Sequence, residues 1–267
     1  MLPYVHIFSR EIPMYGILAG LGILLAVVYL KLAEKRAPSL AADAELMFLY
    51  GIIGAFVGAK LLYLATVLSD LKVDLPYLWT ETSAFLKKYL NGGFVFFGGL
   101  YGALLAAYIY ARVTKTSLAK LINVVLPVIP LIHGIGRIGC FCMGCCYGRP
   151  SIRWGVLFSQ SDIAPRDIPL LPVQMYEAVG ELLLFVVLAR LGAKGMDGRK
   201  MLIIYLFFYG VLRFLLEFLR GDLYRGFLLD LSVSQVISVF SVLFAGTLLI
   251  RMEKKKRMRK TKSKSLL

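Results

Sequence analysis

Residues 21–30 read LGILLAVVYL, a stretch without a charged side chain. Residues 184–193, LFVVLARLGA, are nearly as apolar, with one arginine. A helix of a soluble bundle keeps a polar face toward water, and neither stretch has one. Hydrophobic residues make up 59% of the chain, and its mean hydropathy is +0.75. These stretches therefore predict membrane-spanning helices and argue against a soluble bundle.

Apolar runs recur along the whole chain, so we expect an all-α, polytopic membrane protein with about seven transmembrane helices. Each run is close to the ~20 residues that a helix needs to cross a bilayer. No internal repeat or low-complexity linker interrupts them, and we treat residues 1–250 as a single transmembrane domain followed by a basic tail, residues 251–267. The expected spans are residues 13–31, 45–68, 94–112, 121–139, 172–191, 201–219 and 232–250.

The positive charges predict how the spans are oriented. The formal net charge is +15, but Lys and Arg lie in short connections and one tail, which argues against a nucleic-acid-binding groove. Alternate connections are basic, so the positive-inside rule places them and the tail in the cytoplasm and the N-terminus outside. The opening lacks the features of a cleaved signal peptide, so we expect the first run to be retained. The basic stretches are KLAEKRAPS at 31–39, ARVTKTSLAK at 111–120, RLGAKGMDGRK at 190–200 and RMEKKKRMRKTKSKS at 251–265.

Several polar residues fall at one depth, in the outer half of the expected spans. Arg137 ends the fourth span, Tyr15 begins the first, and Arg213 and Glu217 lie four residues apart on one face of the sixth. An ionisable residue inside a span costs ~2.5–3.5 kcal/mol on insertion scales, so such residues suggest a site. Two guanidinium groups suit a phosphate; snorkelling side chains are the alternative. The start of the fifth span, LPVQMYEAVGEL, adds Gln174, Tyr176, Glu177 and Glu181.

Glycine is dense at two outward places, NGGFVFFGGLYG at 91–102 and HGIGRIG at 133–139. Glycine allows irregular backbone and close helix approach, so we expect a pocket that opens to the outer leaflet. His133 lies one turn before Arg137. We interpret His133 as a packed, hydrogen-bonded histidine, with a chemical role as the alternative.

Taken together, these motifs resemble the prolipoprotein diacylglyceryl transferase family. The most specific pieces are GRIGCFCMGCCYG at 136–148 and YGVLRFLLEFLRGD at 209–222. The pieces follow the family's order across nearly the whole chain. The others are PMYG at 13–16, VGAKLLY at 57–63, GGFVFFGGLYG at 92–102, PVQMYE at 172–177 and LSVSQ at 231–235.

The resemblance implies an enzyme of the bacterial cytoplasmic (inner) membrane whose active site faces outward. It implies transfer of the diacylglyceryl group of phosphatidylglycerol to the lipobox cysteine thiol of a preprolipoprotein, with release of glycerol phosphate and no cofactor. It also implies that Arg137 and Arg213 bind the head group, Glu217 holds the second arginine, Tyr15 lines the lipid pocket and Gly148 closes the signature loop. The expected catalytic residues are Arg137, Arg213, Glu217, Cys140 and Cys145. The expected substrate-binding residues are Tyr15, Gly98, Gly99, Gly148, Gln174, Tyr176 and Glu177.

The chain departs from the family pattern at four positions. Cys140 stands where the family usually has Asn, Cys145 where it has Glu, and Phe97 where it has His. Leu171 replaces the His of a His-Pro pair. The alternative function is therefore a catalytically degenerate lipid-binding or thiol-redox membrane protein of the same fold. A transporter is a third possibility, but the sequence lacks matched inverted repeats.

All four cysteines lie within residues 140–146. On an oxidising side of the membrane, disulfides are plausible between Cys140 or Cys142 and Cys145 or Cys146. The C-x-C-x-x-C-C spacing is not the paired C-x-x-C of a structural zinc site, so we name no metal ligand and keep a metal site as the third reading. We expect a disulfide or packed-thiol role, with a catalytic thiol as the second reading.

Overall fold

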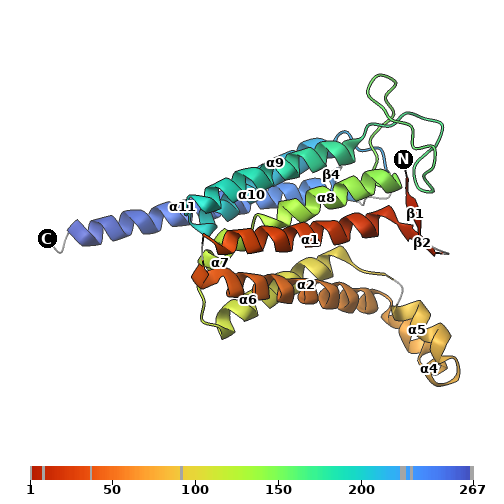
Figure 1. Cartoon of the computed structure of the whole chain (residues 1–267), viewed down its shortest axis with the longest axis horizontal. Coiled ribbons are helices and arrows are strands. Elements are labelled where there is room, and N and C mark those ends of the chain that lie inside the picture. The colour runs from red at the N-terminus through yellow and green to blue at the C-terminus, as the bar shows by residue number, and fades with distance from the viewer. Residues whose placement is uncertain are drawn as a thin grey trace. The chain divides into compact units, whose positions relative to one another are not determined.

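The fold is described from a computed structural model, which covers residues 2–7, 10–36, 38–90, 93–222, 227–228 and 231–264. Helices dominate, and the strands form two short antiparallel hairpins (Figure 1). The elements are β1 (Tyr4–Ile7), β2 (Arg10–Pro13), α1 (Met14–Glu34), α2 (Pro38–Thr66), α3 (Leu68–Asp74), α4 (Tyr77–Thr80), α5 (Thr82–Leu90), α6 (Phe96–Val113), α7 (Leu118–Val125), α8 (Val128–Met143), α9 (Val173–Ala193), α10 (Gly198–Glu217), β3 (Phe227–Leu228), β4 (Leu231–Ser232) and α11 (Val233–Lys264).

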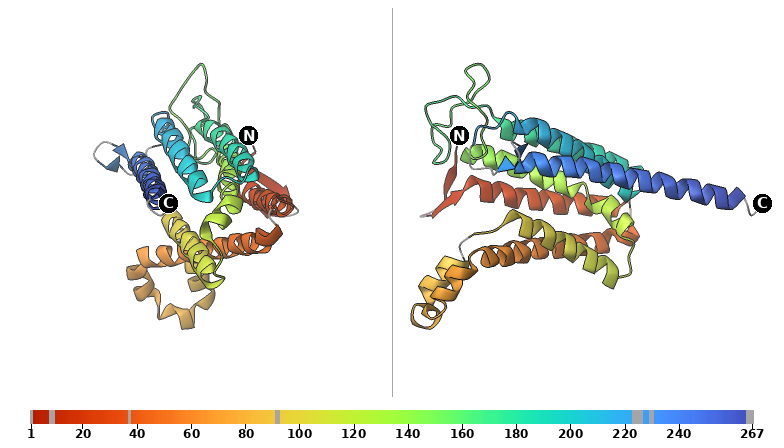
Figure 2. Two further views of the ribbon diagram at one scale, coloured as in Figure 1. Left: turned by 90° about the vertical axis from the view of Figure 1, so that its left-hand side faces the viewer. Right: turned by 180° about the vertical axis from the view of Figure 1, so that it is seen from behind.

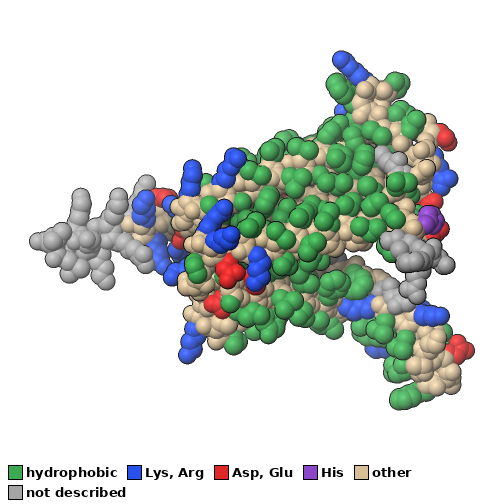
Figure 3. Space-filling view, viewed as in Figure 1, with side chains coloured by type: hydrophobic (Ala, Val, Ile, Leu, Met, Phe, Trp, Pro, Cys, Tyr) green, Lys and Arg blue, Asp and Glu red, His purple; other side chains and the backbone are tan. Residues whose placement is uncertain are grey.

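Helices cover all seven stretches that the hydropathy predicted as spans. Exposed hydrophobic side chains lie over the middle of the helices, and charged ones gather toward their ends (Figure 3). Helices α6, α9 and α10 account for three of the stretches. The helical membrane fold is therefore confirmed. Among the residues that the structure describes, the segments long and apolar enough to cross a membrane by length and composition alone are Met14–Glu34, Pro38–Thr66, Leu118–Met143 and Val233–Lys256.

The expected span 121–139 is in fact two helices, α7 and α8. Proline has no backbone N–H to donate, so Pro127 favours the break between them. Helix α8 then continues to Met143, and α11 continues through most of the expected basic tail. The hairpin of β1 and β2 and the short helices α3–α5 were not predicted, because neither segment has a long apolar period.

The chain forms two compact units, residues 38–121 and residues 1–37 with 122–267. In the first unit, α2 packs along α6. A Cβ atom on Gly98 would collide with the carbonyl oxygen of Gly58, so this crossing requires glycine. Gly99 faces Ala55 in the same contact, with its added Cβ 3.3 Å from the Ala55 oxygen. Both predicted substrate-binding glycines therefore have a packing role, and the treatment of residues 1–250 as one domain stays a prediction.

In the second unit the long helices pack in chain order. Helix α1 packs on α8, α8 on α9, α9 on α10 and α10 on α11 (Figure 2). One cluster of buried side chains ties α9 to α10, and its fully buried members include Leu188 and Met201. Helix α9 runs opposite to α8 and α10, so the end of α8, the start of α9 and the end of α10 lie together (Figure 1).

Candidate active site

Helix α8 ends in a turn that folds the chain back on the helix. Gly144 has φ +75°, a left-handed conformation that glycine adopts without a Cβ penalty. Its N–H donates to the Phe141 carbonyl at 3.2 Å, and the Cys145 N–H donates to the Cys140 carbonyl at 3.1 Å. These two bonds are the Schellman pattern of helix termination. This turn places Cys145 next to Cys140, so the local backbone conformation is enough to bring two thiols together.

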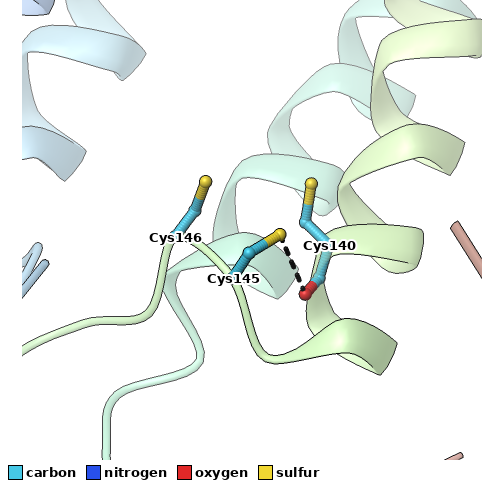
Figure 4. A group of neighbouring side chains, drawn as sticks. All are labelled: Cys140, Cys145 and Cys146. Carbon is cyan, nitrogen blue, oxygen red and sulfur yellow. Dashed lines mark hydrogen bonds between the residues drawn. The ribbon is translucent and has the colours of Figure 1, made fainter. Parts of the chain in front are cut away.

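The thiols of Cys140, Cys145 and Cys146 form one cluster, which we call the thiol cluster. Their sulfur atoms lie within 4.8 Å of one another, and the Cys145 Sγ is 3.6 Å from the Cys140 oxygen (Figure 4). Cys146 has φ +58°, which is uncommon outside glycine and turns the chain sharply at this residue. Cys142 lies outside the cluster. All four cysteines are free thiols, so none of the predicted disulfide pairings is formed in the structure.

Two arginines border the thiol cluster. Hydrogen bonds from the thiols of Cys140 and Cys145, together with the positive charges of Arg220 and Arg137, lower the pKa of the Cys146 thiol. The thiolate is the form of cysteine that attacks carbon and binds metals.

The signature loop after the thiol cluster is held between two helix ends. The Gly148 N–H donates to the Leu171 carbonyl at 2.9 Å, at the start of α9. The Arg149 N–H donates to the Leu219 carbonyl at 2.8 Å, just beyond α10. A Cβ atom on Gly148 would lie 2.6 Å from the Leu171 Cβ, so this close approach requires glycine. Gly148 thus has a packing role in the loop that the resemblance assigned to it.

A buried carboxylate joins the two predicted arginines. Arg137 Nε on α8 and Arg213 Nη1 on α10 each lie 3.0 Å from Oε2 of Glu177 on α9. Arg213 Nη2 also lies 2.9 Å from Glu217 Oε2 and donates to Ser234 Oγ at 3.1 Å. Both carboxylates are almost fully buried. Four predicted site residues from three helices therefore meet at one point, although sequence spacing predicted only the contact of Arg213 with Glu217.

The two arginines differ in the donors that they keep free. A guanidinium carries five N–H donors. Arg213 uses both Nη groups on the contacts just described. Arg137 contacts Glu177 and His133 through Nε, and within the described part of the chain its Nη groups make no hydrogen bond to protein. An anion can therefore bind the Nη edge of Arg137 without displacing Glu177.

His133 completes the network from α8. Its Nδ1 lies 2.6 Å from Glu181 Oε1, and its Nε2 accepts from Arg137 Nε at 3.2 Å. Glu181 is fully buried. Glu181 was expected among the polar residues at this depth but not among the site residues, and His133 was interpreted as a packed, hydrogen-bonded histidine. His133 and Arg137 are four residues apart, and so are Glu177 and Glu181, so each pair lies on one face of its helix. This shared spacing is the sequence signal that could have predicted the contact between the two faces.

The remaining predicted residues take different positions in this unit. Tyr15 on α1 lies against Gly139 of α8, and its side chain is half exposed. Gln174 is buried and donates to the Cys145 carbonyl at 2.7 Å, so it holds the loop of the thiol cluster. Tyr176 is 38% exposed and borders a groove. The side chain of Phe97 lies outside the described residues.

An open groove of about 620 Å³ lies between the loop after the thiol cluster, the start of α9 and the residues just beyond α10. Its lining does not include Arg137, Arg213 or the thiols. The groove therefore does not coincide with the charged network or with the thiol cluster. It is lined by Arg149, Pro150, Ser151, Trp154, Leu171, Tyr176 and Leu219.

Comparison with known proteins decides the family. The sequence profile described as prolipoprotein diacylglyceryl transferase matches residues 3–251. The chain belongs to this family. The phosphatidylglycerol–prolipoprotein diacylglyceryl transferase of Clostridium tetani is 36% identical over 242 residues, which cover 89% of this chain and 92% of the relative. The transferase 2 of Clostridium perfringens is 31% identical over 263 residues, or 97% and 98% of the two chains. The transferase of Cupriavidus metallidurans is 30% identical over 256 residues, or 92% and 91%.

Membership in the prolipoprotein diacylglyceryl transferase family confirms the resemblance read from the motifs. It makes this chain a multi-pass membrane protein and a transferase. The structure adds how the unusual residues are used. Two of the departures from the family pattern, Cys140 and Cys145, belong to the thiol cluster, and a third, Leu171, accepts the hydrogen bond from Gly148.

Proposed function

We propose that this chain transfers the diacylglyceryl group of phosphatidylglycerol to the lipobox cysteine thiol of a preprolipoprotein. Relatives named for this donor and acceptor match it over about nine tenths of its length or more. The observation that carries the proposal is Arg137, because it is fixed through Nε and keeps its Nη donors for a substrate. Paired Nη donors match the oxygens of a phosphate.

Arg137 binds the phosphate of the donor lipid in this proposal. Glu177 and Arg213 act as positioning residues, because Glu177 fixes the Nε edge of Arg137 and Arg213 fixes Glu177. Glu217 holds Arg213 in turn. Displacement needs the phosphate held in one orientation relative to the attacking thiol, and a rigid chain of buried ion pairs supports that orientation.

The reaction forms a carbon–sulfur bond and breaks the bond between the diacylglyceryl carbon and the phosphate oxygen. Glycerol phosphate leaves, and the acceptor thiol loses its proton because a thiolate is the nucleophile. We assign His133 and Glu181 to orienting Arg137, since His133 Nε2 already accepts from Arg137 Nε. Tyr15 and Tyr176 are exposed enough to contact the lipid donor or the acceptor segment.

The reaction takes place at the outer face of the bacterial cytoplasmic membrane in this proposal. The alternation of basic connections in the sequence supports that orientation, because the positive-inside rule assigns the basic tail and the connections 31–39, 111–120 and 190–200 to the cytoplasm.

A transfer assay tests the proposal against the degenerate alternative. Purified protein is mixed with phosphatidylglycerol vesicles and a lipobox peptide, and the mass of the peptide is measured by mass spectrometry. We expect the peptide to gain one diacylglyceryl group on its cysteine. A peptide with serine in place of that cysteine is the matched control and gains nothing. An unchanged cysteine peptide would favour a lipid-binding protein that lost the chemistry.

A further inference from the structure

The thiol cluster has the shape of a metal site that its sequence spacing does not reveal. Cys140 comes from the last turn of α8, whereas Cys145 and Cys146 come from the turn that follows it (Figure 4). Gly144 reverses the chain between them, so three sulfurs converge within 4.8 Å although the motif lacks paired C-x-x-C spacing. A disulfide would use two of these sulfurs and leave the third unexplained.

The sulfur separations suit one small ion. Zinc binds thiolate sulfur at about 2.3 Å, so tetrahedral ligands lie about 3.8 Å apart. Small side-chain rotations bring three sulfurs already within 4.8 Å to that separation. Thiolate sulfur is also the ligand type that zinc and other soft metals prefer.

The charges near the cluster suit a site with three thiolates. Three thiolates and one Zn²⁺ carry a net charge of −1, which buried surroundings would disfavour without a counter-charge. Arg137 lies three residues before Cys140 on α8, and the Arg220 backbone pairs with Gly148, two residues after Cys146, so both arginines are placed to supply that positive charge. Among the described residues, no fourth Cys, His, Asp or Glu belongs to the group. A zinc site with three protein ligands keeps a fourth position open, which is the mark of catalytic zinc.

We propose that Cys140, Cys145 and Cys146 bind one zinc ion and that its fourth position takes the lipobox cysteine thiol. This proposal rests on the proposed transferase function. The acceptor thiol loses its proton to water on binding and becomes a zinc-bound thiolate. The sulfur then attacks the diacylglyceryl carbon, the carbon–oxygen bond breaks, and the electron pair leaves with the phosphate on Arg137. The released proton balances the second negative charge of the glycerol phosphate, and zinc changes neither charge nor oxidation state.

Metal binding is measured first on the reduced, full-length protein in detergent. We expect about one zinc per chain after dialysis against Zn²⁺. Cobalt(II) in its place should give the sulfur-to-cobalt charge-transfer absorption of a thiolate site. Cys140→Ser and Cys146→Ser should bind at least tenfold more weakly. Cys142→Ser is the matched control, since Cys142 lies outside the cluster, and it should bind like the parent.

Binding of the lipobox thiol to the fourth position of the metal is tested on the parent protein alone, so that misfolding of a variant cannot explain the result. A lipobox peptide should shift the cobalt spectrum, and its serine counterpart should not. Removing the metal with a chelator should lower transfer activity at least tenfold, and zinc should restore it.

The outcomes separate this proposal from the proposed function. A reduced parent that binds no more metal than Cys140→Ser would overturn the zinc site. If that protein still transfers the diacylglyceryl group, the proposed transferase function is retained. Metal that binds without a peptide-dependent shift and without an effect on transfer would also overturn the proposal. A cysteine-specific shift without any transfer would support the site and refute the transferase.

Discussion

Arg137 Nε and Arg213 Nη1 contact the same oxygen atom of Glu177, each at 3.0 Å. Two positively charged side chains share one buried carboxylate. Removal of either arginine would leave buried negative charge without its partner. Glu177 therefore links α8 to α10 through its ion pairs with the two arginines. It also directs the Nη edge of Arg137 to a different partner, which we infer to be the phosphate of the donor lipid.

Arg137→Lys should lose nearly as much transfer activity as Arg137→Ala. Lysine keeps the charge but cannot contact Glu177 and a phosphate through separate edges of one planar group. We expect at least a roughly 100-fold fall in kcat/KM for both variants. Membrane preparations with equal protein levels provide the measurement, and Arg166→Lys is the control because Arg166 forms an exposed ion pair with Asp162. Parent-like activity in Arg137→Ala would exclude the phosphate role.

Glu177→Gln should destabilise the protein by about 3–5 kcal/mol, because removing one partner of a buried charge cluster leaves the others uncompensated. Denaturant unfolding in detergent micelles measures the change in the free energy of unfolding. Asp162→Asn removes an exposed carboxylate from an ion pair of similar length, and should change stability by less than about 1 kcal/mol. Equal stability of the two variants would mean that the ion pairs of Glu177 do not stabilise the packing of α8 and α10.

Gly144→Ala should destabilise the end of α8 by about 1–2 kcal/mol, since alanine is strained at φ +75°. The added methyl would also collide with Ser161. Gly136→Ala is the matched control in the same helix, because the space around Gly136 is open, and it should be neutral or slightly stabilising. Thermal unfolding followed by circular dichroism distinguishes them. A Gly144→Ala variant as stable as Gly136→Ala would contradict the left-handed helix end.

Reporter fusions should place the two sides of the membrane. A topology reporter fused after Leu267 should report the cytoplasm, because the tail is the most basic stretch of the chain. A reporter inserted near Leu75 should report the outside. A cytoplasmic signal at Leu75 would reverse the orientation of the whole site.

The positions of the helices could be predicted from the sequence, whereas most contacts within the candidate site could not. Long apolar runs such as residues 21–30 locate helices because the bilayer allows few other structures. The pair of Arg213 and Glu217 followed from helix spacing. The contact of Arg137 with Glu177 did not, since it depends on how α8 and α9 rotate against each other. The expected disulfide pairings already placed Cys140 close to Cys145 or Cys146, but the grouping of all three sulfurs depends on the left-handed conformations of Gly144 and Cys146, which the sequence did not predict.

The mass of a lipobox peptide after incubation with the purified protein and phosphatidylglycerol is the most direct test of the proposed activity. We expect the cysteine peptide to gain one diacylglyceryl group with the parent protein and the serine peptide to stay unmodified. We also expect an equal amount of released glycerol phosphate. An unmodified cysteine peptide, from protein that is folded, reduced and supplied with zinc, would contradict the account.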